Sequence, residues 1–135
     1  MGARKRLKAN ERKEMKSKIA FAKLNDCPTS PRKMRLIADL IRGMNVNIAL
    51  QQLKLNPKEA SGRMEKLLLS ALSNWESKNE GKRMDDYDLY VEEVKVDGGR
   101  MLKRIQPAPQ GRAHRIRKRS NHVTLIVNSR NKENN

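Results

Sequence analysis

The chain has 135 residues, with 31 Lys and Arg against 15 Asp and Glu, for a net charge of +16. The length suits one domain, and the excess of positive charge favours nucleic acid or an anionic membrane surface as partner. Aromatic residues make up only 3% of the chain, which excludes a platform that binds single strands by stacking their bases.

Several other classes of protein are also disfavoured. No apolar run approaches the ~18 residues of a membrane-spanning helix, and none follows the positive charges at the N-terminus, so we expect no membrane segment and no secretory signal. Cys27 is the single cysteine, which fits a reducing cytosol. His114 and His122 lack neighbours at metal-ligand spacing, and no glycine-rich phosphate loop, GxSxG or HExxH motif occurs. We expect no metal, no cofactor and no enzyme.

Residues 1–18 form a basic N-terminal tail that carries eight Lys and Arg, diluted by Glu11 and Glu14. Such a segment buries too little apolar surface to order alone, although it could form a helix when bound. A solvated tail that only aids solubility is an equal alternative. Residues 19–24 are predicted to form a short strand, although the pattern is weak, and residues 25–31 are predicted to form a turn.

The first predicted helix begins after Ser30, which can cap it, with Pro31 in its first turn and Gly43 at its end. Its apolar face is predicted to contain Met34, Ile37, Ala38 and Ile41, widened by Leu36 and Leu40.

Three basic residues, Arg32, Lys33 and Arg35, crowd the start of this helix. Their sign opposes the helix dipole, which favours anions there, so we expect them to meet an external anion such as phosphate. An ordinary solvated face is the alternative.

Two further helices follow. Asn45 can cap the second, and Asn56 with Glu59 resembles a capping box at the start of the third, with Pro57 at its first position. The third helix has the most continuous apolar stripe in the chain: Ala60, Met64, Leu67, Leu68, Ala71, Leu72 and Trp75. We interpret Trp75 as a core residue and not as a ligand platform.

Residues 77–86 are predicted to be a polar loop, and residues 87–96 a strand. Leu89 and Val91 have one parity along this strand and Val94 and Val96 the other, so a bulge near Glu92-Glu93 would bring all four onto one face. After the basic segment described next, Val123, Leu125 and Val127 return to the same core.

The segment Gly98–His122 lies between these strands and lacks the apolar alternation that could bury a face. It contains no acidic residue and eight basic ones: Arg100, Lys103, Arg104, Arg112, Arg115, Arg117, Lys118 and Arg119. We interpret it as a long β-hairpin arm turning at Pro107–Gly111. An isolated two-stranded ribbon is marginal in water, so a polyanion should complete it. A disordered basic loop is the alternative.

The predicted fold is α+β: three helices packed on a small antiparallel sheet, with a long basic β-hairpin arm. We divide the chain into the tail of residues 1–18, a single α+β domain of residues 19–129 that is expected to bind RNA and includes the arm at 97–122, and a C-terminal tail of residues 130–135.

Two stretches resemble the L-twenty-two family of bacterial large-subunit ribosomal proteins. SPRKMRLIADLIRG, residues 30–43, is similar to that family's first-helix signature, and LKRIQPAPQGRAHRIRKRSNHVTLIV, residues 102–127, is similar to its hairpin signature. The order of elements also matches across residues 19–129. The resemblance implies three helices on a three-stranded sheet with a long hairpin. It also implies a non-catalytic protein of the cytoplasmic ribosome, with its body near the outer end of the peptide exit tunnel.

The resemblance implies which residues meet ribosomal RNA. Arg32, Lys33 and Arg35 match the family's basic helix start, and Arg42-Gly43 its helix end; in the arm, Lys103, Arg104, Gly111, Arg112, Arg115, Lys118 and Arg119 match. Ala108 stands where relatives often have Arg, and Pro109 where Ala is common, so this tip is less charged and stiffer.

The tip of the arm has no charged residue: Ile105, Gln106, Pro107, Ala108, Pro109, Gln110 and Gly111. Taken with the resemblance, this predicts that the tip lines the tunnel wall and meets the nascent peptide. The expected partners are then large-subunit ribosomal RNA, neighbouring ribosomal proteins and the nascent chain, with the protein a monomer within the ribosome.

A free-standing architectural DNA-binding protein with a basic β-arm is the alternative function. Such a protein normally clamps a duplex as a dimer, and the sequence shows no additional apolar stripe for a dimer interface. Sedimentation with the large subunit or with the nucleoid would discriminate between the two.

Overall fold

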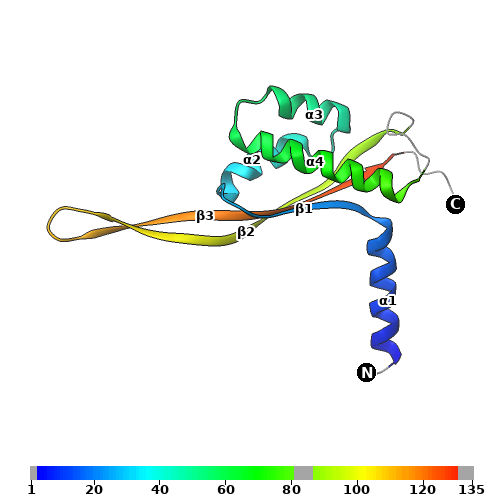
Figure 1. The fold of residues 1–135 in the computed structure, drawn as a ribbon, viewed down its shortest axis with the longest axis horizontal. Coiled ribbons are helices and arrows are strands. Elements are labelled where there is room, and N and C mark those ends of the chain that lie inside the picture. The colour runs from blue at the N-terminus through cyan, green and yellow to red at the C-terminus, as the bar shows by residue number, and fades with distance from the viewer. Residues whose placement is uncertain (1–2, 81–86, 131–135) are drawn as a thin grey trace.

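The computed structural model describes residues 3–80 and 87–130. The elements follow the order α1 (Ala3–Lys18), β1 (Ala20–Cys27), α2 (Pro31–Ile41), α3 (Val46–Leu55), α4 (Glu59–Lys78), β2 (Leu89–Pro107) and β3 (Ala113–Ser129). Helices α2, α3 and α4 cover one face of a three-stranded antiparallel sheet, and β2 and β3 continue far beyond it as the arm (Figure 1). The α+β class and the hairpin arm are confirmed.

The sheet has the order β1-β3-β2, so the last strand of the chain lies at its centre. Val123, Leu125 and Val127 on β3 alternate toward the helices and are buried, as the sequence predicts. The register of β2 against β3 shifts between Val91 and Glu93, which is the predicted bulge. Because the bulge adds one residue, Val91 and Val94 both reach the core.

Helix α2 forms as its sequence predicts. The Ser30 hydroxyl accepts a hydrogen bond from the Lys33 amide, Pro31 occupies the first turn, and Gly43 ends the helix with a φ of +77°. Met34, Ile37, Ala38 and Ile41 are all buried, and Leu40 packs against the core. The prediction for Leu36 is wrong: it is 57% exposed, because it lies on the outer side of the helix.

Helix α4 carries the predicted stripe, and all seven of its residues are buried. Trp75 lies in the core with its ring centroid 5.5 Å from that of Tyr87. The predicted capping box is wrong. The helix begins at Glu59, two residues after Pro57, with Lys58 as N-cap, and the Asn56 side chain accepts from the Lys58 amide at 3.1 Å.

Two boundaries differ from the prediction. Helix α4 continues through Lys78, into the segment predicted as a polar loop, and residues 81–86 of that segment lie outside the described residues. Strand β1 continues to Cys27, into the predicted turn of residues 25–31, with a register shift between Leu24 and Cys27 and a φ of +50° at Asp26. Strand β3 runs to Ser129, the residue before the predicted C-terminal tail of residues 130–135.

The N-terminal segment is the helix α1, where the sequence predicts a tail that orders only on binding. None of its residues is buried, so that part of the prediction is correct. The segment 3–18 contains no Gly or Pro and is rich in Lys, Arg, Glu, Leu, Met and Ala, which are strong helix formers. Local propensity therefore favours a helix in this segment, although no core contact supports it.

Candidate nucleic-acid interface

The arm is a regular two-stranded ribbon almost to its tip. The pairing of β2 with β3 continues to Pro107 opposite Ala113. The turn is closed by the Ala108 amide, which donates to the Arg112 carbonyl at 2.9 Å. Gln110 and Gly111 both have positive φ, 62° and 68°, which reverses the chain. The seven predicted tip residues lie at this end, and only Ala108 is partly buried.

The ladder gives the arm two unequal faces, because directly paired residues point to the same side of a ribbon. One side holds three pairs: Met101 with Arg119, Lys103 with Arg117, and Ile105 with Arg115. The other side holds Leu102 with Lys118, Arg104 with Ile116, and Gln106 with His114. We call the first side, with Lys103, Arg115, Arg117 and Arg119, the basic face.

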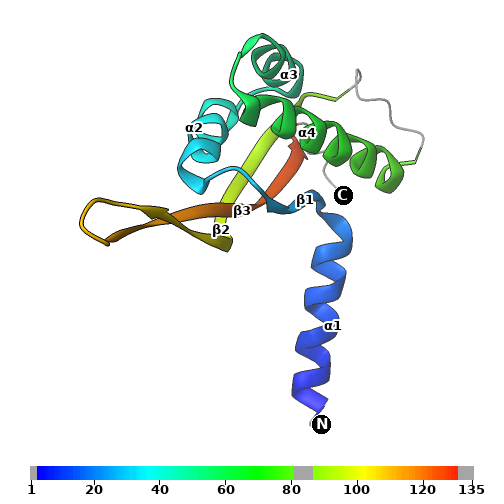
Figure 2. The same cartoon turned by 60° about the vertical axis from the view of Figure 1, so that its left-hand side comes forward.

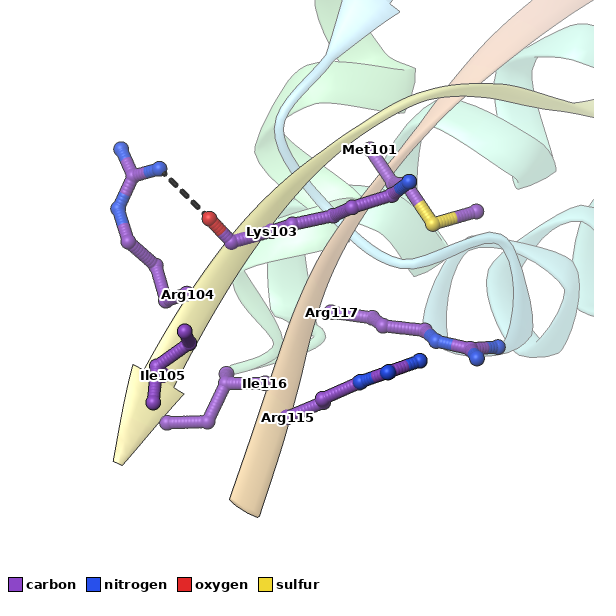
Figure 3. A pocket seen from close by; sticks show the side chains of 7 residues that line it. All are labelled: Met101, Lys103, Arg104, Ile105, Arg115, Ile116 and Arg117. Atoms are coloured by element: carbon purple, nitrogen blue, oxygen red, sulfur yellow. Dashed lines mark hydrogen bonds between the residues drawn. The ribbon is translucent and has the colours of Figure 1, made fainter. Parts of the chain in front are cut away.

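Figure 3 shows this division at close range. Lys103, Arg115 and Arg117 extend to one side of the ribbon, whereas Arg104 extends to the other, where it donates to the Lys103 carbonyl at 3.0 Å. In this view Ile105 lies at the end of the drawn part of β2, and Ile116 extends from β3 toward it. Within residues 87–130 and 3–80, no ion pair involves a basic residue between Arg100 and Arg119. The arm thus presents concentrated, uncompensated positive charge.

The base of the arm is fixed to the body by polar contacts. The register shifts again between Gly98 and Met101, where the Ser120 hydroxyl donates to the Arg100 carbonyl. The Asn121 side chain is 0% exposed and donates to the Thr29 carbonyl. The next residue, His122, accepts at Nδ1 from the Asp26 amide at 3.0 Å. These contacts join β3 to the segment before α2 and give the arm a defined root.

Asn121 is the residue that the sequence reasoning missed. It lies at the end of a basic run, where an asparagine is usually exposed. The available signal was parity, because Asn121 has the same alternation as Val123 and Leu125 and must therefore face the core.

The basic start of α2 lies beside the root of the arm. Arg32, Lys33 and Arg35 are all exposed. The Arg35 guanidinium donates to the Val96 carbonyl at 3.3 Å, and that of Arg42 donates to the Val94 carbonyl at 3.0 Å. These bonds hold α2 against β2 at the point where β2 leaves the body to form the arm. The basic start of α2 therefore lies beside the base of the basic arm. Arg42 also pairs with Asp39 at 2.7 Å, which leaves it less available to a ligand than the other three.

The rest of the described chain offers little other chemistry. Among the described residues, no three His, Cys, Asp or Glu side chains are grouped so that they could hold a metal ion. Within the same ranges, no helix is both long and apolar enough to cross a membrane.

Comparison with known proteins gives a consistent result. The sequence profile of the family described as Ribosomal protein L22p/L17e matches residues 22–128. The large ribosomal subunit protein uL22 of Christiangramia forsetii is 63% identical over 131 residues, which cover 97% of each chain. The proteins of the same name from Bacteroides fragilis and Porphyromonas gingivalis are 60% identical over 130 residues and 58% identical over 135 residues. These alignments cover 96% of this chain and 95% of the former relative, and the whole of both chains for the latter.

Proposed function

The chain belongs to the ribosomal protein L22p/L17e family, and on that premise we propose that it binds ribosomal RNA through the arm and the start of α2. It is a structural, non-catalytic protein of the large ribosomal subunit, and it is located in the cytoplasm within the ribosome. It therefore takes part in translation as a component of a ribonucleoprotein, in which it associates with neighbouring ribosomal proteins.

The observation that carries the RNA-binding proposal is the basic face of the arm. Lys103, Arg115, Arg117 and Arg119 share one side of a ribbon that has no core. Lys and Arg side chains displace condensed counterions from phosphates, which gives binding that weakens steeply with salt. A narrow, extended ribbon also suits a crevice in folded RNA, which proteins recognise by shape and phosphate contacts more than by sequence.

The start of α2 extends this interface onto the body. Arg32 and Lys33 are exposed in a first turn that has no acidic residue, so nothing local offsets their unfavourable position at the positive end of the helix dipole. Because Arg35 bonds to β2 at the root of the arm, RNA that follows the arm inward would reach these side chains next.

The tip has a different proposed role. Residues 105–111 are uncharged, so RNA affinity should come from the basic residues on both sides of the turn. Pro107 and Pro109 restrict the backbone, and a stiff, neutral surface would not hold a passing chain by electrostatics. We propose that the tip lines the wall of the peptide exit tunnel and meets the nascent peptide.

The RNA-binding proposal is tested by salt dependence. Replacing Lys103, Arg115 and Arg117 together with Gln should lower the affinity for large-subunit ribosomal RNA. It should also reduce the log–log salt slope by roughly 0.7 to 0.9 per lost contact. The matched control replaces Lys54, Lys58 and Lys66, three exposed lysines on the body, and should change the slope much less. An arm variant with an unchanged slope would exclude the arm as the RNA-binding element.

The role of the tip is tested by deletion. Removing residues 108–110 should leave RNA affinity and incorporation into the subunit nearly intact, but should change crosslinking from the tip to a nascent chain. A loss of RNA binding as large as that from replacing Arg115 and Arg117 together would instead make the tip an RNA contact.

A further inference from the structure

Helix α1 is a separate structural element that the arm-based function does not use. It has 16 residues, none of them buried, and it projects away from both the body and the arm in two views of the molecule (Figures 1 and 2). Isolated helices shorter than ~12–15 residues are marginal in water, and most helical stability in proteins comes from packing, which α1 lacks. A partner that covers α1 would therefore stabilise it in the working protein.

The charges of α1 are not evenly distributed around the helix. Lys5, Lys8, Arg12 and Lys16 recur at i, i+3, i+7 and i+11, which places them in one stripe along a single side. The two acidic residues, Glu11 and Glu14, lie with Leu7 in a separate stripe. We call the first set the basic stripe; it extends about 16 Å along the axis, at 1.5 Å per residue.

Among the residues that the structure describes, none supplies an anion paired with the basic stripe. No acidic residue lies in the first turn, where Arg4, Lys5 and Arg6 oppose the helix dipole. Like charges three and four residues apart repel one another along the stripe. Within the described ranges, no ion pair involves any residue of α1.

The C-terminal end of α1, where the helix joins the body, is held by one lysine of the body. The Lys78 ammonium, at the end of α4, donates to the Ile19 carbonyl at 2.6 Å and to the Lys16 carbonyl at 3.5 Å. It also lies 5.5 Å from the centroid of the Phe21 ring. A cation at these carbonyls suits the negative end of the helix dipole and orients α1 as it leaves the body.

We propose that α1 is a second RNA-binding element, whose basic stripe contacts the phosphates of a segment of large-subunit ribosomal RNA away from the arm. The choice of ribosomal RNA as the partner rests on the proposed function. The location of the site does not, because the basic stripe shares no residue with the arm or with α2. The stripe of Glu11 and Glu14 faces away from the phosphates. Binding is by charge and shape, since a stripe of Lys and Arg carries no means of reading bases.

The test uses the full-length protein and large-subunit ribosomal RNA transcribed in vitro. Replacing Lys5, Lys8, Arg12 and Lys16 with Gln should reduce the log–log salt slope of binding by roughly three units. The matched control replaces Arg4, Arg6, Lys13 and Lys18, which removes the same charge from scattered sides of the same helix, and should reduce the slope by less than half as much. Equal losses from the two variants would overturn the proposal in favour of a diffuse basic tail.

A second variant separates helix geometry from charge. Ala9→Pro retains every charge but interrupts α1, so it should weaken RNA binding as the stripe variant does, while the thermal melting of the body stays unchanged because α1 buries nothing. Binding equal to that of the unmodified protein would overturn the proposal. The arm variant is measured in parallel. If it lowers the slope and the stripe variant does not, α1 is not an RNA-binding element but the proposed function stands; if the arm variant has no effect, the proposed function fails by itself.

Discussion

Glu59 and Arg63 form an ion pair one turn apart at the start of α4, with 2.7 Å between Arg63 Nη2 and Glu59 Oε1. The hydrogen bond from Arg63, and then its charge, lower the pKa of the Glu59 carboxyl below its usual value. The pair is exposed, so its contribution to stability is small and is screened by salt.

We predict that Arg63→Gln raises the pKa of Glu59 toward the ordinary range, as measured by NMR titration of the side-chain carboxyl. Since the folded-state pKa is depressed, the stabilisation by the pair is present above the ordinary Glu pKa and is lost as the pH falls through the lowered value. Lys66→Gln, a lysine one turn further along the same helix, serves as the control. An unchanged Glu59 titration in the Arg63 variant would contradict this assignment.

At the scale of elements, the base of the arm requires a close approach between β2 and β3. A Cβ added to Gly99 would lie 2.8 Å from Ser120 Oγ and 3.2 Å from the Asn121 amide nitrogen. The Ser120 hydroxyl is held by its bond to the Arg100 carbonyl, and Asn121 is held by its buried side chain, so neither moves freely. A Cβ at the neighbouring Gly98 would meet nothing within 4 Å.

We predict that Gly99→Ala destabilises the protein by roughly 1–3 kcal/mol, the usual cost of forcing extra volume into a packed site. Gly98→Ala should be nearly neutral and is the matched control. Urea denaturation of both variants gives the comparison, and similar stabilities for the two would show that the strands separate at the base without cost.

The elements differ in how far the sequence predicted them. The apolar stripes of α2 and α4 and the bulge at Glu92-Glu93 follow from periodicity alone, since burial on one face leaves a regular pattern. The capping of α4 did not follow, because Asn56 and Glu59 have the right spacing but bond to Lys58 and Arg63 instead. The partner of Asn121 also did not follow, because Thr29 is distant in the chain. The two faces of the arm required the strand register, which shifts at Gly98 and Met101.

At the scale of the whole molecule, the protein is a packed body with an arm that has no core of its own. The buried residues are all within the sheet and the helices on it, or at the arm's root. An isolated two-stranded ribbon is marginal in water, and this one carries many like charges.

We predict that the body folds in the free protein and that the arm orders fully only on RNA. Hydrogen exchange should show strong protection in α4 and none near Pro107, because exposed ladder bonds open with little cost. Adding large-subunit ribosomal RNA should raise protection along the arm. Strong protection at Arg104 or Arg112 without RNA would contradict this division.

The central claim is that the basic face of the arm lies against RNA of the large ribosomal subunit. The most direct measurement places a photo-crosslinking residue at Arg117 in cells and sequences the nucleic acid that is attached after irradiation. A matched probe at Lys66, on the outer side of α4, measures the background. The account predicts that the Arg117 probe attaches chiefly to large-subunit ribosomal RNA, at a few positions that the Lys66 probe does not share. Attachment chiefly to DNA, or to RNA with no preference for the large subunit, would contradict it.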